Sequence, residues 1–179
     1  LGPGSKINSQ QMQIRSDHRE LLQQAAIAGA DVDHMGDFTV AVDNLVQRLM
    51  ETGAGATAPK VGEPMPSFLL PDEQGRLIGL EDLLAEGPVA IAFHRGYWCP
   101  YCRININALA RAEAEIAPEH RHIAAVVPDR QKYAAWLKSD AKVPFPILTD
   151  MDSGYAMSLD LSFWVGEELK QSMVSCVWD

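Results

Sequence analysis

Two short apolar runs, separated by a segment of helical period, constrain the fold of this 179-residue chain more than any other feature of its sequence. Val89–Phe93 and Ile123–Val127 have the length and composition of buried strands, and Pro100 opens a stretch of helical spacing between them. Consecutive parallel strands need a crossover of this kind. The alternation predicts an α/β fold with a mostly parallel central sheet, covered by helices on both faces, in which Val89–Phe93 is a central strand.

Shorter elements extend this pattern on both sides of the two apolar runs. We expect strands at Ser67–Leu70, Leu77–Leu80 and Pro146–Thr149, and helices at Leu80–Ala85, Pro100–Ala117, Arg130–Ser139 and Glu167–Met173, with a loop or helix through Ser153–Leu159. The stretch Asp72–Arg76 reads as a turn between the first two strands.

The first third of the chain has a different pattern, because it shows helical spacing without strands. One helix is predicted to run from Ser9 or Ser16 to about Ala28, and a second from Asp37 to Thr52, where Gly53 ends it. Two helices alone bury little apolar surface. We therefore expect them to dock on the rest of the chain or to form a homodimer with a second copy.

These patterns divide the chain into four parts. Residues 1–5 resemble the remnant of a cloning or protease site, 6–53 form the N-terminal helical segment, 54–60 a flexible linker and 61–179 the α/β domain.

Charge and cysteine content exclude several classes of protein. The chain has 15 basic and 24 acidic residues, a net charge of −9, which disfavours non-specific binding to nucleic acid or to anionic membranes. No apolar run approaches the length of a membrane span, and no charged start followed by an apolar stretch suggests a secretion signal. Three cysteines do not make a disulfide framework. We expect a cytoplasmic protein that uses thiols for chemistry or for metal binding.

The residues best suited to chemistry form a Cys-x-x-Cys between the first apolar run and the helix that follows it. Cys99 and Cys102 lie where a helix begins, and Pro100 suits its first turn. Unpaired N–H groups at a helix N-terminus stabilise a thiolate. Residues 87–112 contain no Asp or Glu but include Arg95 near the thiols. Arg95 is thus the best candidate to stabilise a thiolate by charge.

Three interpretations of the two thiols stay open at this point. They can form a redox pair that closes a small disulfide. They can form half of a zinc site, which would need Cys176 and one of His94, His120 or His122. They can also be inert core thiols packed beside Trp98.

The stretch Ala92-Phe-His-Arg-Gly-Tyr-Trp-Cys-Pro-Tyr-Cys102 resembles the active-site loop of peroxiredoxin-like members of the alkyl hydroperoxide reductase/thiol-specific antioxidant family, in the thioredoxin superfamily. Residues 60–71, 72–84 and 144–150 are similar to other segments of that family, so the resemblance covers roughly 60–160. It implies a thioredoxin-like fold and a thiol peroxidase that reduces hydrogen peroxide or small organic hydroperoxides. No cofactor or metal is implied, and the electrons would come from an external thiol reductant such as a thioredoxin or glutaredoxin.

Two overlays within this superfamily give the cysteines opposite roles. Laid on the peroxiredoxin pattern Pro-x-x-x-Thr-x-x-Cys, Cys102 is the attacking thiol and Cys99 its partner, with Arg95 where a proline is usual. Laid on the thioredoxin pattern Trp-Cys-x-x-Cys, Trp98 matches directly and Cys99 attacks first, which suits a thiol-disulfide oxidoreductase. We expect the peroxidase roles, with Trp98 and Pro100 as supporting residues.

The end of the chain departs from the family pattern. No arginine follows Arg130 and no proline follows Pro146, although the family carries an activating arginine and a proline-led strand further along. The last strands of the fold are therefore expected to be missing. This departure keeps a third function open, that of a non-catalytic thioredoxin-like domain that binds a partner or senses redox state.

Overall fold

A computed structural model of the chain describes residues 35–116 and 122–171. Its elements follow one another as α2 (Met35–Thr52), β1 (Leu69–Pro71), β2 (Leu77–Gly79), α3 (Leu80–Glu86), β3 (Ala90–Phe93), α4 (Pro100–Glu115), β4 (Ile123–Val127), α5 (Gln131–Ala141), β5 (Ile147–Thr149), η2 (Met151–Ser153) and α6 (Gly154–Ser158). A short helix at 167–171 closes the described part of the chain.

The strands form two sheets. β1 and β2 make an antiparallel hairpin, whose turn contains Gly75 at a φ of 83°. β3, β4 and β5 form a parallel sheet in that order, with Ala92 opposite Ala125 and Val126 opposite Leu148. The predicted α/β class and parallel sheet are confirmed. The prediction that Val89–Phe93 is central is wrong for the described residues, where β3 is an edge strand and β4 lies in the middle.

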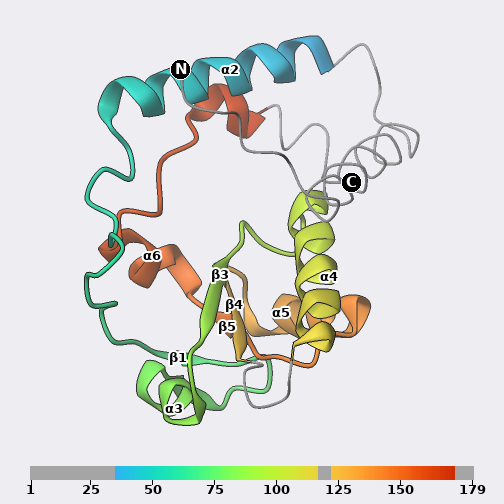
Figure 1. The fold of residues 1–179 in the computed structure, drawn as a ribbon. Helices are drawn as coiled ribbons and strands as arrows, with labels where there is room; N and C mark the ends of the chain where they lie inside the picture. Colours follow the sequence, from blue (N-terminus) through green and yellow to red (C-terminus); the bar gives the residue numbers. More distant parts are fainter. Residues whose placement is uncertain (1–34, 117–121, 172–179) are drawn as a thin grey trace, which may run out of the picture.

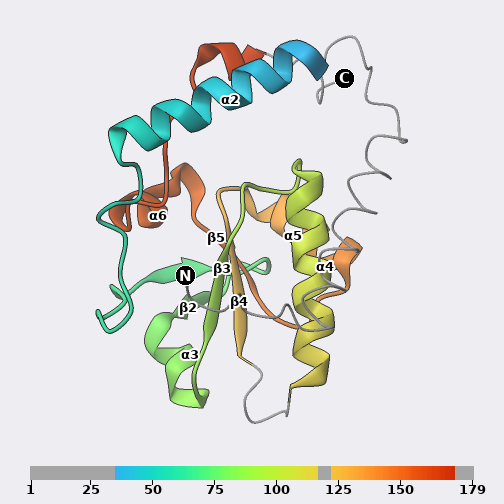
Figure 2. The same ribbon diagram turned by 45° about the horizontal axis from the view of Figure 1, so that its top comes forward.

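Both faces of the parallel sheet are covered by helices, as its fully buried central strand requires. α4 and α5 lie on one face, and α3 and α6 on the other (Figures 1 and 2). Alternate residues of β4 point into two separate cores, because side chains alternate across a strand. Ile123, Ala125 and Val127 join the core under α4 and α5, whereas Ala124 and Val126 join the other.

A half-buried ion pair attaches the hairpin turn to the helical layer. Glu73 is 8% exposed, and its carboxylate accepts a hydrogen bond of 2.6 Å from Lys138 Nζ in α5. Its second oxygen accepts the backbone N–H of Ile147 at 3.2 Å, at the start of β5. The carboxylate therefore connects three elements that are distant in the sequence.

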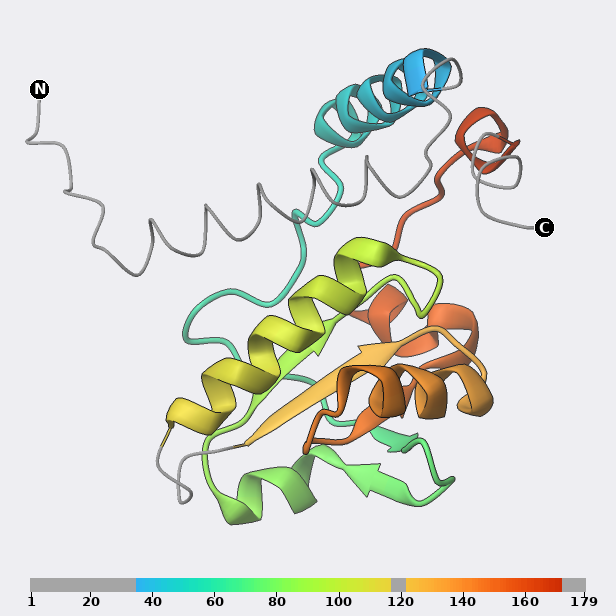
Figure 3. The ribbon, with the colours of Figure 1, turned by 90° about the vertical axis from the view of Figure 1, so that its right-hand side faces the viewer.

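α2 lies apart from the sheet, beside the 167–171 helix (Figure 3). Arg48 donates to the carbonyl oxygen of Trp164 at 2.6 Å, and Thr57, just beyond α2, binds the carboxylate of Asp160. Val46 and Met50 remain exposed on α2. The second predicted N-terminal helix is confirmed by α2, and the first lies outside the described residues. None of the helices in 35–116 and 122–171 is long and apolar enough to cross a membrane.

Candidate active site

The two thiols lie where the chain passes from β3 into α4. The backbone N–H of His94 donates to Val126 at 2.9 Å, so the chain is still held to β4 one residue beyond β3. Cys99 is the residue that caps α4, with an extended backbone, and Pro100 stands in the first turn. Proline fits there because the N–H that it lacks would have no helical partner. Cys102 follows in the same first turn, and its N–H donates to the Cys99 carbonyl at 3.1 Å.

Arg95 contacts both sulfur atoms. Its guanidinium Nη2 donates to Cys99 Sγ at 3.1 Å, and its backbone N–H donates to Cys102 Sγ at 3.2 Å. Trp98 holds this residue in turn, because its indole N–H donates to the Arg95 carbonyl at 3.0 Å. The guanidinium also lies 5.7 Å from the centre of the Trp98 ring, within the range of a cation–π contact.

The surroundings of the two thiols shift their pKa values in opposite directions. The Cys102 thiol donates to Cys99 Sγ, and this contact contributes most to a lowered pKa of Cys99, about 5. The Cys102 N–H and the Arg95 guanidinium lower this pKa further, whereas burial acts in the opposite direction. The pKa of Cys102 is raised, because its proton is held by Cys99 and because the thiol is buried. In this arrangement the negative charge is favoured on Cys99 and the proton on Cys102.

Asp129 supports the loop from the neighbouring strand. It follows β4 at the edge where β3 also ends, and its carboxylate accepts the backbone N–H of Tyr97 at 2.6 Å. Gly96 lies beside it at a φ of 129°, and a Cβ there would stand 2.8 Å from Asp129 Oδ1 and 3.0 Å from Trp98 Nε1. Only glycine fits this backbone and this space. Burial raises the pKa of Asp129.

Both cysteines are reduced and buried. Cys99 is 0% exposed and Cys102 6%, and no disulfide joins them. A cavity of about 820 Å³ opens beside them, lined by Arg95 and Trp98 of the loop, by Phe93, and by residues that follow β5. Cys99 does not itself line this cavity, but Arg95, which donates to its sulfur, does.

The structure brings all five sequence-predicted site residues into one loop and helix start, because Arg95, Trp98, Cys99, Pro100 and Cys102 are close in sequence. Cys176 and His120 lie outside the described residues, so the zinc site that would include Cys176 is not tested. Within the described ranges, no group of three or more His, Cys, Asp and Glu side chains is placed to hold a metal ion.

Sequence reasoning missed Asp129 and Asn105. His94 Nε2 lies 2.9 Å from Asn105 Oδ1, which fixes the imidazole against α4. Asp129 could have been found from its position directly after a buried strand, since the carboxyl ends of neighbouring parallel strands meet at one edge. Asn105 carried no such signal, because a polar residue on a helix usually faces solvent.

Comparison with known proteins supports the fold described above. Residues 61–169 match the sequence model of the AhpC/TSA family, over more than half of the chain. The crystal structure of peroxidoxin BcpB from Mycobacterium tuberculosis is similar in fold, with a TM-score of 0.52 and 23% identity over 55% of this chain and 64% of that chain. An uncharacterized conserved protein from Geobacillus kaustophilus aligns with a TM-score of 0.47 and 20% identity, over 55% and 57% of the two chains.

The chain thus spans less than two thirds of the length of either of these solved structures. No curated protein matches it.

Proposed function

Because the chain belongs to the AhpC/TSA family, with a peroxiredoxin-like, thioredoxin-type fold, we propose that it is a thiol peroxidase that reduces hydrogen peroxide or small organic hydroperoxides. The observation that carries this proposal is the contact of 3.1 Å between the Arg95 guanidinium and Cys99 Sγ. It supplies a stabilised thiolate, which is the reactive form of cysteine, together with a donor for the charge that develops on a departing oxygen.

The proposed reaction begins with attack by the Cys99 thiolate on one peroxide oxygen. The O–O bond breaks, Cys99 becomes a sulfenic acid, and the leaving oxygen departs as water or an alcohol after taking a proton. Cys102 then attacks the sulfenic sulfur, a disulfide forms, and the sulfenic oxygen leaves as water. An external dithiol, of the thioredoxin or glutaredoxin type, returns two electrons and restores both thiols.

This assignment gives the attack to Cys99, as the thioredoxin overlay does, and reverses the roles in the peroxiredoxin overlay. The contacts of the site support it, because the Cys102 thiol and the Arg95 guanidinium both donate to Cys99 and lower its pKa, whereas the same donation and burial raise the pKa of Cys102. Burial supports a small substrate. A peroxide is no larger than a few atoms, whereas a protein disulfide has to reach a sulfur that is 0% exposed in the reduced form.

The experiment follows sulfenic acid formation at low peroxide in Cys99→Ser and Cys102→Ser, both made with Cys176→Ser so that the third thiol does not interfere. We expect Cys102→Ser to form a sulfenic acid that persists, since its partner is gone, and Cys99→Ser to react no faster than a free thiol. Rapid oxidation of Cys99→Ser would move the attack to Cys102. If the wild type also reacts no faster than a free thiol, the peroxidase proposal fails.

The thiol-disulfide oxidoreductase stays the second candidate, because a thiolate at Cys99 would serve it equally well. Reduction of insulin disulfides by the same variants separates the two activities. An oxidoreductase would reduce insulin with Cys99 present and would show no advantage over a free thiol with peroxide. A domain that only binds or senses would be inactive in both assays.

A homodimer through the N-terminal helices remains part of the proposal, and exposed Val46 and Met50 on α2 are consistent with it.

A further inference from the structure

Three aromatic side chains form a cluster on the surface next to the thiol loop, which we call the aromatic patch: Tyr97, Tyr133 and Trp136. Tyr97 stacks on Tyr133 with ring centres 6.4 Å apart, and Trp136 meets both rings edge-on at 5.8 and 5.3 Å. Trp136 is 49% exposed although its neighbours on α5, Ala134 and Leu137, are fully buried. The sequence reasoning gave Tyr133 and Trp136 no role, and the proposed peroxide chemistry does not use them.

Two cations border the aromatic patch. Lys132 Nζ lies 4.7 Å from the centre of the Tyr133 ring and 5.5 Å from that of Trp136, and the Arg103 guanidinium lies 5.5 Å from the Tyr97 ring. Both are exposed, and neither forms a salt bridge with an acidic side chain of the described part of the chain. In a protein of net charge −9, these two exposed cations stand against the exposed carboxylate of Asp140 at the same cluster, which leaves a local excess of positive charge.

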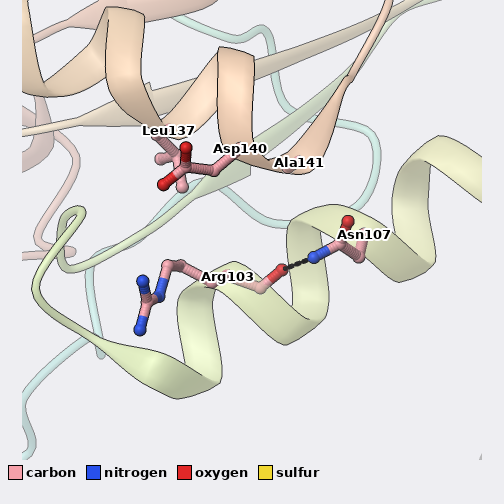
Figure 4. Close-up of a pocket in the computed structure, with 5 residues that line it drawn as sticks. All are labelled: Arg103, Asn107, Leu137, Asp140 and Ala141. Carbon is pink, nitrogen blue, oxygen red and sulfur yellow. Dashed lines mark hydrogen bonds between the residues drawn. The ribbon is translucent and has the colours of Figure 1, made fainter.

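Two acidic groups border this surface. The Asp140 carboxylate accepts the Tyr97 hydroxyl at 2.8 Å, and Asp129 accepts the Tyr97 backbone N–H. A hollow of about 210 Å³ lies between α4 and α5, where Arg103 and Asp140 are on opposite walls (Figure 4). It is large enough for one side chain of a partner.

The position of Tyr97 connects the patch to the thiols. It lies two residues before Cys99 in the same loop, and its backbone is held by Asp129. Exposed Tyr, Trp and Arg are the residues most enriched at the centres of protein interfaces. A partner that covers the patch is therefore placed directly beside the loop that has to move before Cys99, which is fully buried, becomes accessible.

We propose that the aromatic patch with Lys132 and Arg103 is the docking surface for the protein that reduces the Cys99–Cys102 disulfide, and that this partner presents acidic side chains around its own dithiol. The inference rests on the proposed peroxidase function. The attractive charge supports it, because opposite surfaces speed encounter and orient the partner.

The docked reductant restores both thiols in two thiol-disulfide exchange steps. A thiolate of the reductant attacks Cys99 Sγ, the disulfide breaks, and Cys102 leaves and takes one proton. The reductant's second thiol, as thiolate, attacks the mixed disulfide and releases Cys99 as thiolate. The reductant is oxidised to a disulfide by two electrons, and its other proton passes to solvent.

The test uses two synthetic dithiol peptides as reductants, each with a Cys-Gly-Pro-Cys core, one flanked by three glutamates and the other by three lysines. Peroxide turnover is measured with each peptide and with dithiothreitol, for the wild type, Lys132→Glu and Trp136→Ala. Lys60→Glu is the matched control, since it makes the same charge change at an exposed position outside the patch.

We expect a lower KM for the glutamate peptide than for the lysine peptide, with a difference that shrinks in high salt. Lys132→Glu should raise the KM for the glutamate peptide about threefold to tenfold, the range for one exposed attraction turned into a repulsion. Trp136→Ala should raise the KM for both peptides about tenfold, as loss of a central interface residue does. The kcat, the dithiothreitol activity and the behaviour of Lys60→Glu should not change.

The outcomes separate the two proposals. Absence of turnover with dithiothreitol refutes the peroxidase function itself. If the protein turns over with dithiothreitol, three results refute the docking surface alone. They are equal KM values for the two peptides, no turnover with either peptide, or KM values that Lys132→Glu and Trp136→Ala leave unchanged.

Discussion

Replacing Arg95 by methionine tests the electrostatic reasoning about the thiols most directly. Methionine keeps much of the length of the side chain but removes the charge that lies 3.1 Å from Cys99 Sγ. The pKa of Cys99 is about 5, and the Cys102 contacts, which contribute the largest part, stay in place. An opposite charge at this range lowers a thiol pKa by about one to three pH units, so Arg95→Met should raise the pKa of Cys99 by that amount.

The size of the effect depends on the pH at which it is measured. With a pKa of about 5, roughly three quarters of Cys99 is thiolate at pH 5.5, whereas a rise of about two units leaves roughly 3%, about a 25-fold loss. At pH 8 more than roughly 90% would still be thiolate in the variant, so the difference almost disappears. A comparison at pH 8 alone would therefore miss the role of Arg95.

The assay is thiolate absorbance at 240 nm as a function of pH, in a Cys176→Ser background. It reports ionisation without the change in nucleophilicity that accompanies a change in pKa. Arg103→Met serves as the control, since its guanidinium lies over Tyr97 and makes no contact with either sulfur in the structure. Equal titration curves for Arg95→Met and the wild type would refute the assignment of Arg95 as a thiolate-stabilising group.

Three further predictions concern the loop, the ion pair and pH. Gly96→Ala should lower the free energy of unfolding by about 1–3 kcal/mol and slow the oxidation of Cys99, because φ is 129° and the new Cβ meets Asp129. An unchanged melting temperature would contradict this. Glu73→Leu should destabilise the fold by about 1–3 kcal/mol in denaturant unfolding, since it removes the acceptor of the half-buried Lys138 amine and of the buried Ile147 N–H. The double change with Lys138→Met should recover part of the loss, and equal stability of the single variant would show that the pair is dispensable. The pKa of Cys99 is about 5 in the folded protein against an ordinary value of 9, so its thiolate adds stability that is complete above pH 9 and lost as the pH falls through 5. The melting temperature of the reduced wild type should therefore rise relative to that of Cys99→Ser between pH 5 and pH 9, and a constant difference would contradict the assignment.

Local sequence was enough to predict those parts of the fold that depend on the spacing of apolar residues or on residues adjacent in the chain. Ile123–Val127 became the buried central strand because five consecutive apolar residues are stable only with both faces covered. Arg95 could be assigned to the thiols because only three residues separate it from Cys99, so the turn into α4 brings them together.

What sequence reasoning missed depends on which elements become neighbours in space. Asp129 reaches the thiol loop only because β3 and β4 pair in parallel and end at the same edge. Tyr133 and Trp136 meet Tyr97 only because α5 lies beside α4 on one face. The edge position of β3 was missed for the same reason, since an apolar run shows that a strand is buried but not how many strands it pairs with.

The contact of Cys99 with Arg95 at the start of α4 also affects the electron balance of the cycle. Every group that stabilises the thiolate of Cys99 favours the dithiol over the disulfide, and so makes the reduction potential of the pair less negative. A Cys99–Cys102 bond in this protein would then be a strong acceptor of electrons rather than a lasting cross-link. The arrangement that prepares the site for an oxidant would thus also make its recovery by a mild thiol donor thermodynamically downhill.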